Sequence, residues 1–167
     1  MVSYLYQAPA GVAGDVSRVD ESNVEPVMLI PVSSVYAQAF GIPMAYVAGG
    51  ASQWQGSNVA ADFQGVLVRE VPGISGSLQQ GFSDNVPYPQ VPQGICVRGY
   101  VMVVCTIGTP ARGGVVYIRT VAAAGKNIGD FEAVSDPGNN IALSSTQAEW
   151  SVDGVDAYGN AELRIAR

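Results

Sequence analysis

The sequence predicts an all-β protein, a jelly-roll-like sandwich or barrel with an extended N-terminal arm and long loops. Short apolar runs rich in β-branched residues recur along the 167 residues, and clusters of Gly, Pro, Asn and Asp separate them. Twenty glycines and ten prolines favour turns. Helical periodicity is limited to one short run, residues 33–40, which lies between Pro31 and Pro43. Regular short strands separated by such turn residues indicate a sandwich or a barrel.

The expected strands combine Val, Ile, Tyr or Phe with turn residues at their ends. In chain order they span residues 27–35, 42–48, 63–71, 94–107, 113–121, 129–134, 148–152 and 160–166. The segments between them, such as "AGGASQWQGSN" and "SDPGNN", are expected to be turns. The length of the chain fits a single β domain over residues 27–167, preceded by an arm over residues 1–26.

Two of these strands carry further information about their surroundings. The run "YVMVVC", residues 100–105, is apolar on both faces, so we expect cover on two sides, by a loop or by a neighbouring subunit. The strand 113–121 alternates instead, as a strand with one wetter face does. Its two faces carry Val116, Ile118 and Thr120 on one side and Val115, Tyr117 and Arg119 on the other.

A long surface excursion is expected over Val71–Pro92, which is rich in Pro, Gly and polar residues. Loops of this length inside a compact domain are usually functional or partner-bound. Phe82 and Tyr88 within it favour a binding loop over a mobile solvent loop. With Trp54, they are the candidate residues for oligomer or loop contacts.

The charge of the chain limits its partners. Charged residues make up only 13%, and 14 acidic against 8 basic residues give a net charge of −6. With a single lysine, Lys126, the chain lacks the basic surface that nucleic acids or anionic membranes require. No apolar run reaches the ~20 residues that span a bilayer, and the N-terminus does not resemble a signal peptide. We expect a protein of the cytosol, or of a particle assembled there.

No catalytic, metal or cofactor site is expected. The chain has no histidine, which removes the commonest general base and most zinc chemistry. Trp54 and Trp150 are expected to be core or interface anchors rather than platforms for a sugar ring. Cys96 and Cys105 are expected to be buried free thiols, because an odd spacing within one strand places their side chains on opposite sides.

Several motifs resemble tailed-bacteriophage capsid cement (decoration) proteins. The run "GVAGDVSRVDESNVEP", Gly11–Pro26, resembles the N-terminal signature of that family. Further similar motifs follow in the same order along nearly the whole chain. They are "AFGIPMAYV", "GVLVREVP", "VRGYVMV", "GGVVYIRT" and "GNAELRI".

The resemblance implies a β-rich virion protein on the outer surface of a phage capsid. Such a protein bridges major capsid protein subunits, stabilises the head and needs no catalytic group. Self-association as a homodimer or homotrimer is expected separately, from the low charge of the chain and the run at residues 100–105 that is apolar on both faces. The alternatives are a tail or baseplate component and a carbohydrate-binding β-sandwich. Location in the particle separates the first two, and glycan binding through Trp54 or Trp150 would favour the third.

The concentration of charge in residues 11–26 suggests a docking arm. Its candidate capsid-binding residues are Gly14, Asp15, Arg18, Asp20 and Glu25. The alternative is an intramolecular cap in which Arg18 pairs with Asp15 or Glu25. The arm hypothesis expects the domain to fold without residues 1–20.

Overall fold

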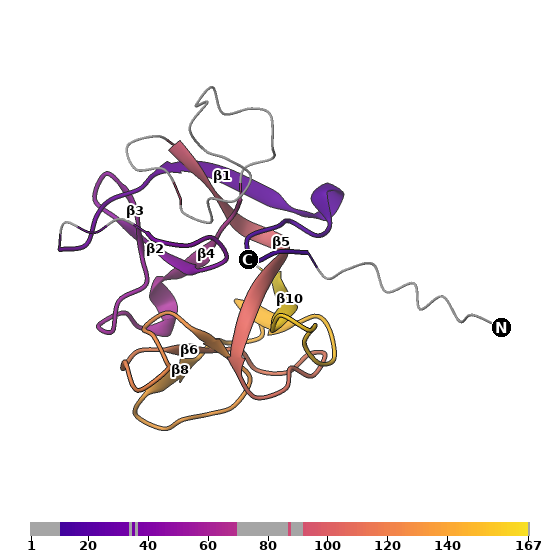
Figure 1. Ribbon diagram of the computed structural model, residues 1–167. Coiled ribbons are helices and arrows are strands. Elements are labelled where there is room, and N and C mark those ends of the chain that lie inside the picture. Colours follow the sequence, from indigo (N-terminus) through magenta and orange to yellow (C-terminus); the bar gives the residue numbers. More distant parts are fainter. Residues whose placement is uncertain (1–10, 34, 36, 70–86, 88–91, 167) are drawn as a thin grey trace.

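The computed structural model describes residues 11–33, 35, 37–69, 87 and 92–166, and it is all-β, as predicted (Figure 1). One connected sheet contains ten strands. They are β1 (Asn23–Met28), β2 (Pro43–Val47), β3 (Gly50–Gln53), β4 (Phe63–Leu67), β5 (Pro92–Ile107), β6 (Tyr117–Arg119), β7 (Phe131–Glu132), β8 (Asn140–Ala142), β9 (Ala148–Trp150) and β10 (Asn160–Ile165). Within the described ranges the only helical elements are the 3-10 turns η1 (Val19–Glu21) and η2 (Ala60–Asp62).

Strand β5, sixteen residues long, is the spine of the molecule. Its first half pairs with β1 and β4, its second half pairs with β10, and its end pairs in parallel with β7. The rest of the sheet extends from it in the order β3-β2-β4-β5-β7-β6-β8. Figure 1 accordingly shows β1–β4 gathered at one end of β5, and β6 and β8 at the other.

Strand β3 lies in a segment that was expected to be a turn, and β8 begins at the last residue of another expected turn. Strand β3 has almost no large side chain, which is why its sequence gives no strand signal. Its first residue, Gly50, is required by packing, because a Cβ there would overlap the Met28 carbonyl group. Small residues thus let β3 lie close to the end of β1, where Ile30 N–H donates to Ala51 O at 2.8 Å.

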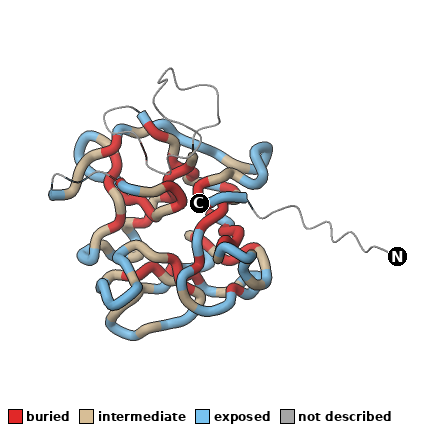
Figure 2. The backbone as a smooth tube through the Cα atoms, viewed as in Figure 1, coloured by how far each residue is buried: buried red, intermediate tan, exposed pale blue. Residues whose placement is uncertain are grey.

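The core consists of two clusters on either side of the sheet's central strands. Figure 2 shows these buried segments along the strands, with the exposed segments mostly in loops. The larger cluster contains both tryptophans, with Trp54 3% and Trp150 1% exposed. The smaller one is built from Leu29, Ala37, Phe40, Met44, Ala51, Leu67 and Ile95. Trp54 is therefore a core residue of this chain and presents little surface to a neighbour.

A bulge in β5 overturns one expectation about the cysteines. Both are free and buried, as expected, but both lie in the larger cluster rather than on opposite sides. Asn23 lies opposite Arg98 and Val24 opposite Cys96, so Val97 has no residue opposite it. One extra residue converts the odd spacing of Cys96 and Cys105 into an even one, because it turns the following side chains to the other face.

The second apolar face of residues 100–105 is covered by another part of the same chain. Val101, Val103 and Cys105 face the larger core cluster. On the other face, Met102 is buried, and Gly11 lies against its Cγ atom. Residues 11–17 therefore supply the cover that a loop or a neighbouring subunit was expected to supply, although Val104 stays partly exposed.

Candidate functional site

The N-terminal segment, defined here as residues 11–28, runs antiparallel along β5. Gly14 N–H donates to Met102 O at 2.8 Å, and Met102 N–H donates to Asp15 O at 2.8 Å. Ser17 N–H then donates to Tyr100 O at 3.1 Å, and after η1 the chain continues as β1. The described part of the predicted arm is thus hydrogen-bonded into its own sheet. Its docking on a capsid stays a prediction.

Gly99 permits the close approach of Ser22, which lies between η1 and β1, to strand β5. Its φ of +115° is a conformation that side-chain-bearing residues rarely adopt, and a Cβ there would overlap Ser22. The Ser22 hydroxyl donates to Arg18 O at 2.7 Å and accepts the Tyr100 N–H at 3.0 Å. Ser22 therefore connects the turn to the spine through the space that glycine leaves.

Arg18 joins the N-terminal segment to the last strand. Its Nη2 lies 2.9 Å from Glu162 Oε2, and its guanidinium stacks 3.9 Å from the centroid of the Tyr100 ring. The expectation that a cap would pair Arg18 with Asp15 or Glu25 is therefore wrong. Arg18 does lie over its own domain, but its partner comes from β10.

Glu162 is held by several donors at once. Its carboxylate accepts hydrogen bonds from the Ser17 hydroxyl at 2.6 Å, from Arg18, and from the Ser151 hydroxyl. Burial raises the pKa of Glu162, and the hydrogen bonds from Ser151, Ser17 and Arg18 lower it by more. The net pKa lies below its ordinary value, so this buried carboxylate stays charged and paired.

The other predicted capsid-binding residues do not gather at one point. Asp15 accepts the Val12 N–H at 2.8 Å and lies 3.8 Å from Arg69 Nε, while Gly14 is buried beside it. Glu25 accepts the Tyr46 hydroxyl at 2.8 Å. Asp20 is exposed and has no side-chain partner in the part of the chain that the structure describes. Phe82 and Tyr88, the predicted loop contacts, lie outside the described residues.

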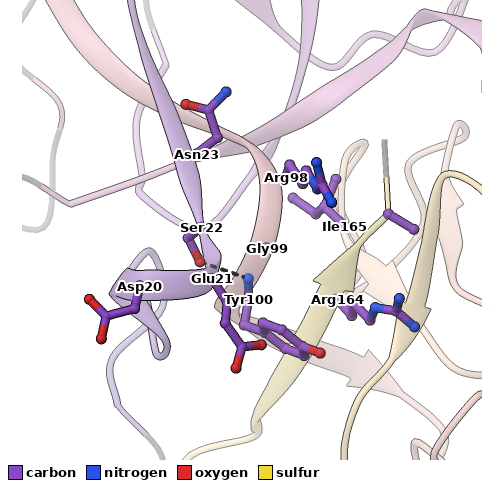
Figure 3. Close-up of a pocket in the computed structure, with 10 residues that line it drawn as sticks. Asp20, Glu21, Ser22, Asn23, Arg98, Gly99, Tyr100, Arg164 and Ile165 are labelled. Atoms are coloured by element: carbon purple, nitrogen blue, oxygen red, sulfur yellow. Dashed lines mark hydrogen bonds between the residues drawn. The ribbon is translucent and has the colours of Figure 1, made fainter.

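A hollow of about 480 Å³ opens beside η1, where β1 and β10 separate from each other along β5 (Figure 3). Asp20 and Glu21 line it from η1, and Arg98 and Arg164 from β5 and β10. Arg164 Nη1 pairs with Glu149 Oε1 at 2.7 Å. Arg98 is exposed, and its guanidinium has no partner among the described residues. The hollow therefore presents charges of both signs around Tyr100.

Sequence reasoning did not identify Arg98 or Arg164 as site residues. The available signal was an arginine next to Gly99 in an otherwise apolar run. Arg164 gave no such signal, because it reaches the hollow only through the pairing of β10 with β5.

A second charged cluster is internal and structural. Arg119 is 1% exposed, although its strand pattern placed it on a wetter face. Its guanidinium lies 2.5 Å from Glu132 Oε1 and 2.7 Å from Asp136 Oδ2, and Asn140 Nδ2 donates to Glu132 at 2.6 Å. These contacts connect β6, β7 and β8. Because Glu132 is fully buried, the pair stabilises the sheet edge instead of facing a ligand.

The described residues contain no group of three or more His, Cys, Asp or Glu side chains placed to hold a metal ion. A helix long and apolar enough to cross a membrane is likewise not found in the described ranges. Most of the described cations are paired with acids of the same chain, across strands or to the N-terminal segment.

The chain belongs to the family described as XM1 gp53 minor capsid protein, whose model matches residues 1–165. A solved chain from "The capsid of Myoviridae Phage XM1" has a similar fold, with a TM-score of 0.67. It is 17% identical, and the match covers 97% of this chain and 94% of that chain. No curated protein matches the sequence. The predicted kinship with phage capsid-associated proteins is confirmed, and the family indicates a structural role in the virion.

Proposed function

We propose that this protein is a non-enzymatic cement protein, which binds the outer surface of the capsid and bridges major capsid protein subunits. The observation that carries the proposal is the exposed apolar face of the N-terminal segment in a member of a minor capsid family. Val12, Val19 and Val24 are exposed there, and Val19 is 73% exposed. Val24 lies on β1 and Val19 in the η1 turn, and exposed apolar side chains gain free energy when a partner covers them.

The charge of the chain supports the outer surface. A net charge of −6 is unfavourable near packed DNA, whereas the outside of the shell requires no contact with phosphates. Asp20 and Glu25 are exposed next to Val19 and Val24 in the sequence, and their carboxylates can accept hydrogen bonds from donors on the shell. Gly14, Asp15 and Arg18 contribute indirectly to binding, because they hold the N-terminal segment in position on its own domain. Self-association as a homodimer or homotrimer completes the proposal.

The two alternatives have less support. A tail or baseplate position has no specific observation in its favour, since the family description names the capsid. A carbohydrate-binding sandwich would need an exposed aromatic platform, but the rings of Trp54 and Trp150 are buried. Trp150 Nε1 also donates to Val115 O at 3.1 Å inside the domain.

A binding assay on heads that lack this protein tests the proposal. Val19→Asp places a charge on the exposed apolar face and should weaken head binding at least about tenfold, the scale of one important interface residue. Val121→Asp is the matched control, because Val121 is 46% exposed at the far end of the sheet, and it should bind like the wild type. Equal binding by both variants would place the contact elsewhere. A wild-type protein that does not bind heads at all would overturn the cement function.

A further inference from the structure

The loop between β9 and β10 presents an unusually exposed aromatic residue. Tyr158 is 86% exposed, more than any other large apolar side chain among the described residues. Its hydroxyl has no partner in those residues either. A tyrosine ring that protrudes this far gives up the free energy that burial would supply, and tyrosine is one of the residues that dominate protein interfaces.

The loop that carries Tyr158 is held in one conformation. Asp156 Oδ1 accepts the N–H groups of Tyr158 and Asn160, each at 2.8 Å, and Asp156 Oδ2 accepts Asn160 Nδ2 at 3.1 Å. Gly159 connects the loop to β5, because its carbonyl accepts the Cys105 N–H at 2.8 Å. A rigid loop loses little conformational entropy when its side chain binds. Tyr158 is therefore a pre-organised anchor.

The hollow beside η1 has the chemistry that receives a phenol. Its Arg98 guanidinium is unpaired among the described residues, and guanidinium planes stack favourably on aromatic rings. Glu21, which lies beside Tyr100, can accept the hydrogen bond of a tyrosine hydroxyl (Figure 3). The same region already stacks Arg18 on Tyr100 at 3.9 Å. A volume of about 480 Å³ is within the range of pockets that hold small ligands.

We propose that Tyr158 of one copy inserts into the hollow of a second copy. Tyr158 precedes the first residue of β10, and Arg164–Ala166 line the hollow at the last residues of that strand. Each copy thus offers an anchor at one end of β10 and a receiving site at the other. Contacts of this head-to-tail kind form closed rings when the rotation between copies closes. The proposal rests on the self-association included in the proposed function, and it names the surfaces that carry it.

Sedimentation equilibrium of the full chain tests this contact. The wild type should associate beyond the 17.3 kDa monomer, and Tyr158→Ala and Arg98→Ala should each raise the dissociation constant at least about tenfold. Arg112→Ala is the control, because Arg112 is also an exposed arginine without an ion pair among the described residues, and it should associate like the wild type.

Mixing the two defective variants gives the decisive result. Each pair of copies then retains one intact contact, between Tyr158 of the Arg98→Ala chain and the hollow of the Tyr158→Ala chain, so heterodimers should form. Association of both variants at wild-type strength, or a mixture that stays monomeric, overturns the proposal. A wild type that is monomeric at high concentration overturns it as well. Binding of monomeric Tyr158→Ala to heads would leave the cement function standing.

Discussion

Arg18 and Glu162 are 144 positions apart in the chain, yet Arg18 Nη2 lies 2.9 Å from Glu162 Oε2. The pair fastens the N-terminal segment to the last strand. Arg18 also stacks on Tyr100 of the spine, and Glu162 also accepts a hydrogen bond from Ser17 of the segment. The segment is therefore part of the folded domain. A chain without residues 1–20 is expected to be less stable than the full chain, because it loses this pair and the backbone bonds to β5.

Arg18→Ala should lower the free energy of unfolding by about 1–2 kcal/mol, the scale of a charge-assisted hydrogen bond at a partly exposed site. Glu162 keeps its two serine donors, so the loss is limited. Arg164→Ala removes a pair on the open surface, to Glu149, and should cost measurably less. Urea unfolding of the three proteins measures both effects. Equal losses in the two variants would refute the structural role given to Arg18.

The stability of the wild type should decrease at acid pH partly through Glu162. Its pKa is lower in the folded state, so its contribution is present above the ordinary value of 4.5 and is lost as the pH falls through the folded-state pKa. The Glu162→Gln variant has no carboxylate at this position, so its stability does not include this pH-dependent contribution. The difference in unfolding free energy between the two proteins should shrink as the pH is lowered from 6 toward 3. A constant difference over that range would contradict the assignment.

Gly99→Ala should be the most damaging small substitution in the spine. The added Cβ must displace Ser22, and φ is +115°, so a loss of about 3 kcal/mol is expected. Gly113→Ala is the matched control, because Gly113 has a φ of +73° but open space around it, and it should lose only about 1 kcal/mol. Thermal unfolding compares the two. If Gly113→Ala were as destabilising as Gly99→Ala, the contact with Ser22 would be unimportant.

The sequence predicted those features of the fold that local pattern encodes. Apolar runs between turn residues located most strands, because a strand covered by a core needs such a run. Strand β3 was missed because its close packing depends on Gly50 rather than on large side chains. The side assigned to Cys105 was wrong because a bulge at Val97 cannot be recognised from alternation alone.

The site was harder to predict than the fold, because its contacts join distant positions. The charged run at residues 11–26 drew attention to Arg18, but its partner Glu162 comes from the other end of the chain. The alternation of its strand placed Arg119 on a wetter face, yet Arg119 is buried, because Glu132 and Asp136 pair with its guanidinium. Local sequence cannot show which acid will neutralise a given arginine. Arg164 likewise reaches the hollow that Arg98 lines only because β10 pairs with β5.

Removal of one partner from the buried Arg119–Glu132 pair should be costly. Arg119→Met leaves a fully buried carboxylate without its cation and is expected to cost about 3–5 kcal/mol. Arg119→Met combined with Glu132→Leu should recover part of that loss, because no buried charge is then left unpaired. Chemical denaturation of the single and double variants measures the coupling. Losses that simply add would show that the two side chains act independently.

Both cysteines should be unreactive in the native protein. Burial raises the pKa of the Cys96 thiol to about 11 and also raises the pKa of Cys105, so little thiolate forms at pH 8. Alkylation at that pH should modify neither residue until denaturant is added, and both afterwards. A reductant should leave the unfolding free energy unchanged. A loss of about 2–5 kcal/mol on reduction would instead reveal a native disulfide.

Imaging of the intact head at subunit resolution tests the central claim most directly. The account predicts density for this β domain on the outer surface of the shell, with the exposed face around Val19 against a major capsid protein subunit and contacts to at least two such subunits. Density on the inner surface, in the tail, or in contact with a single shell subunit would contradict it.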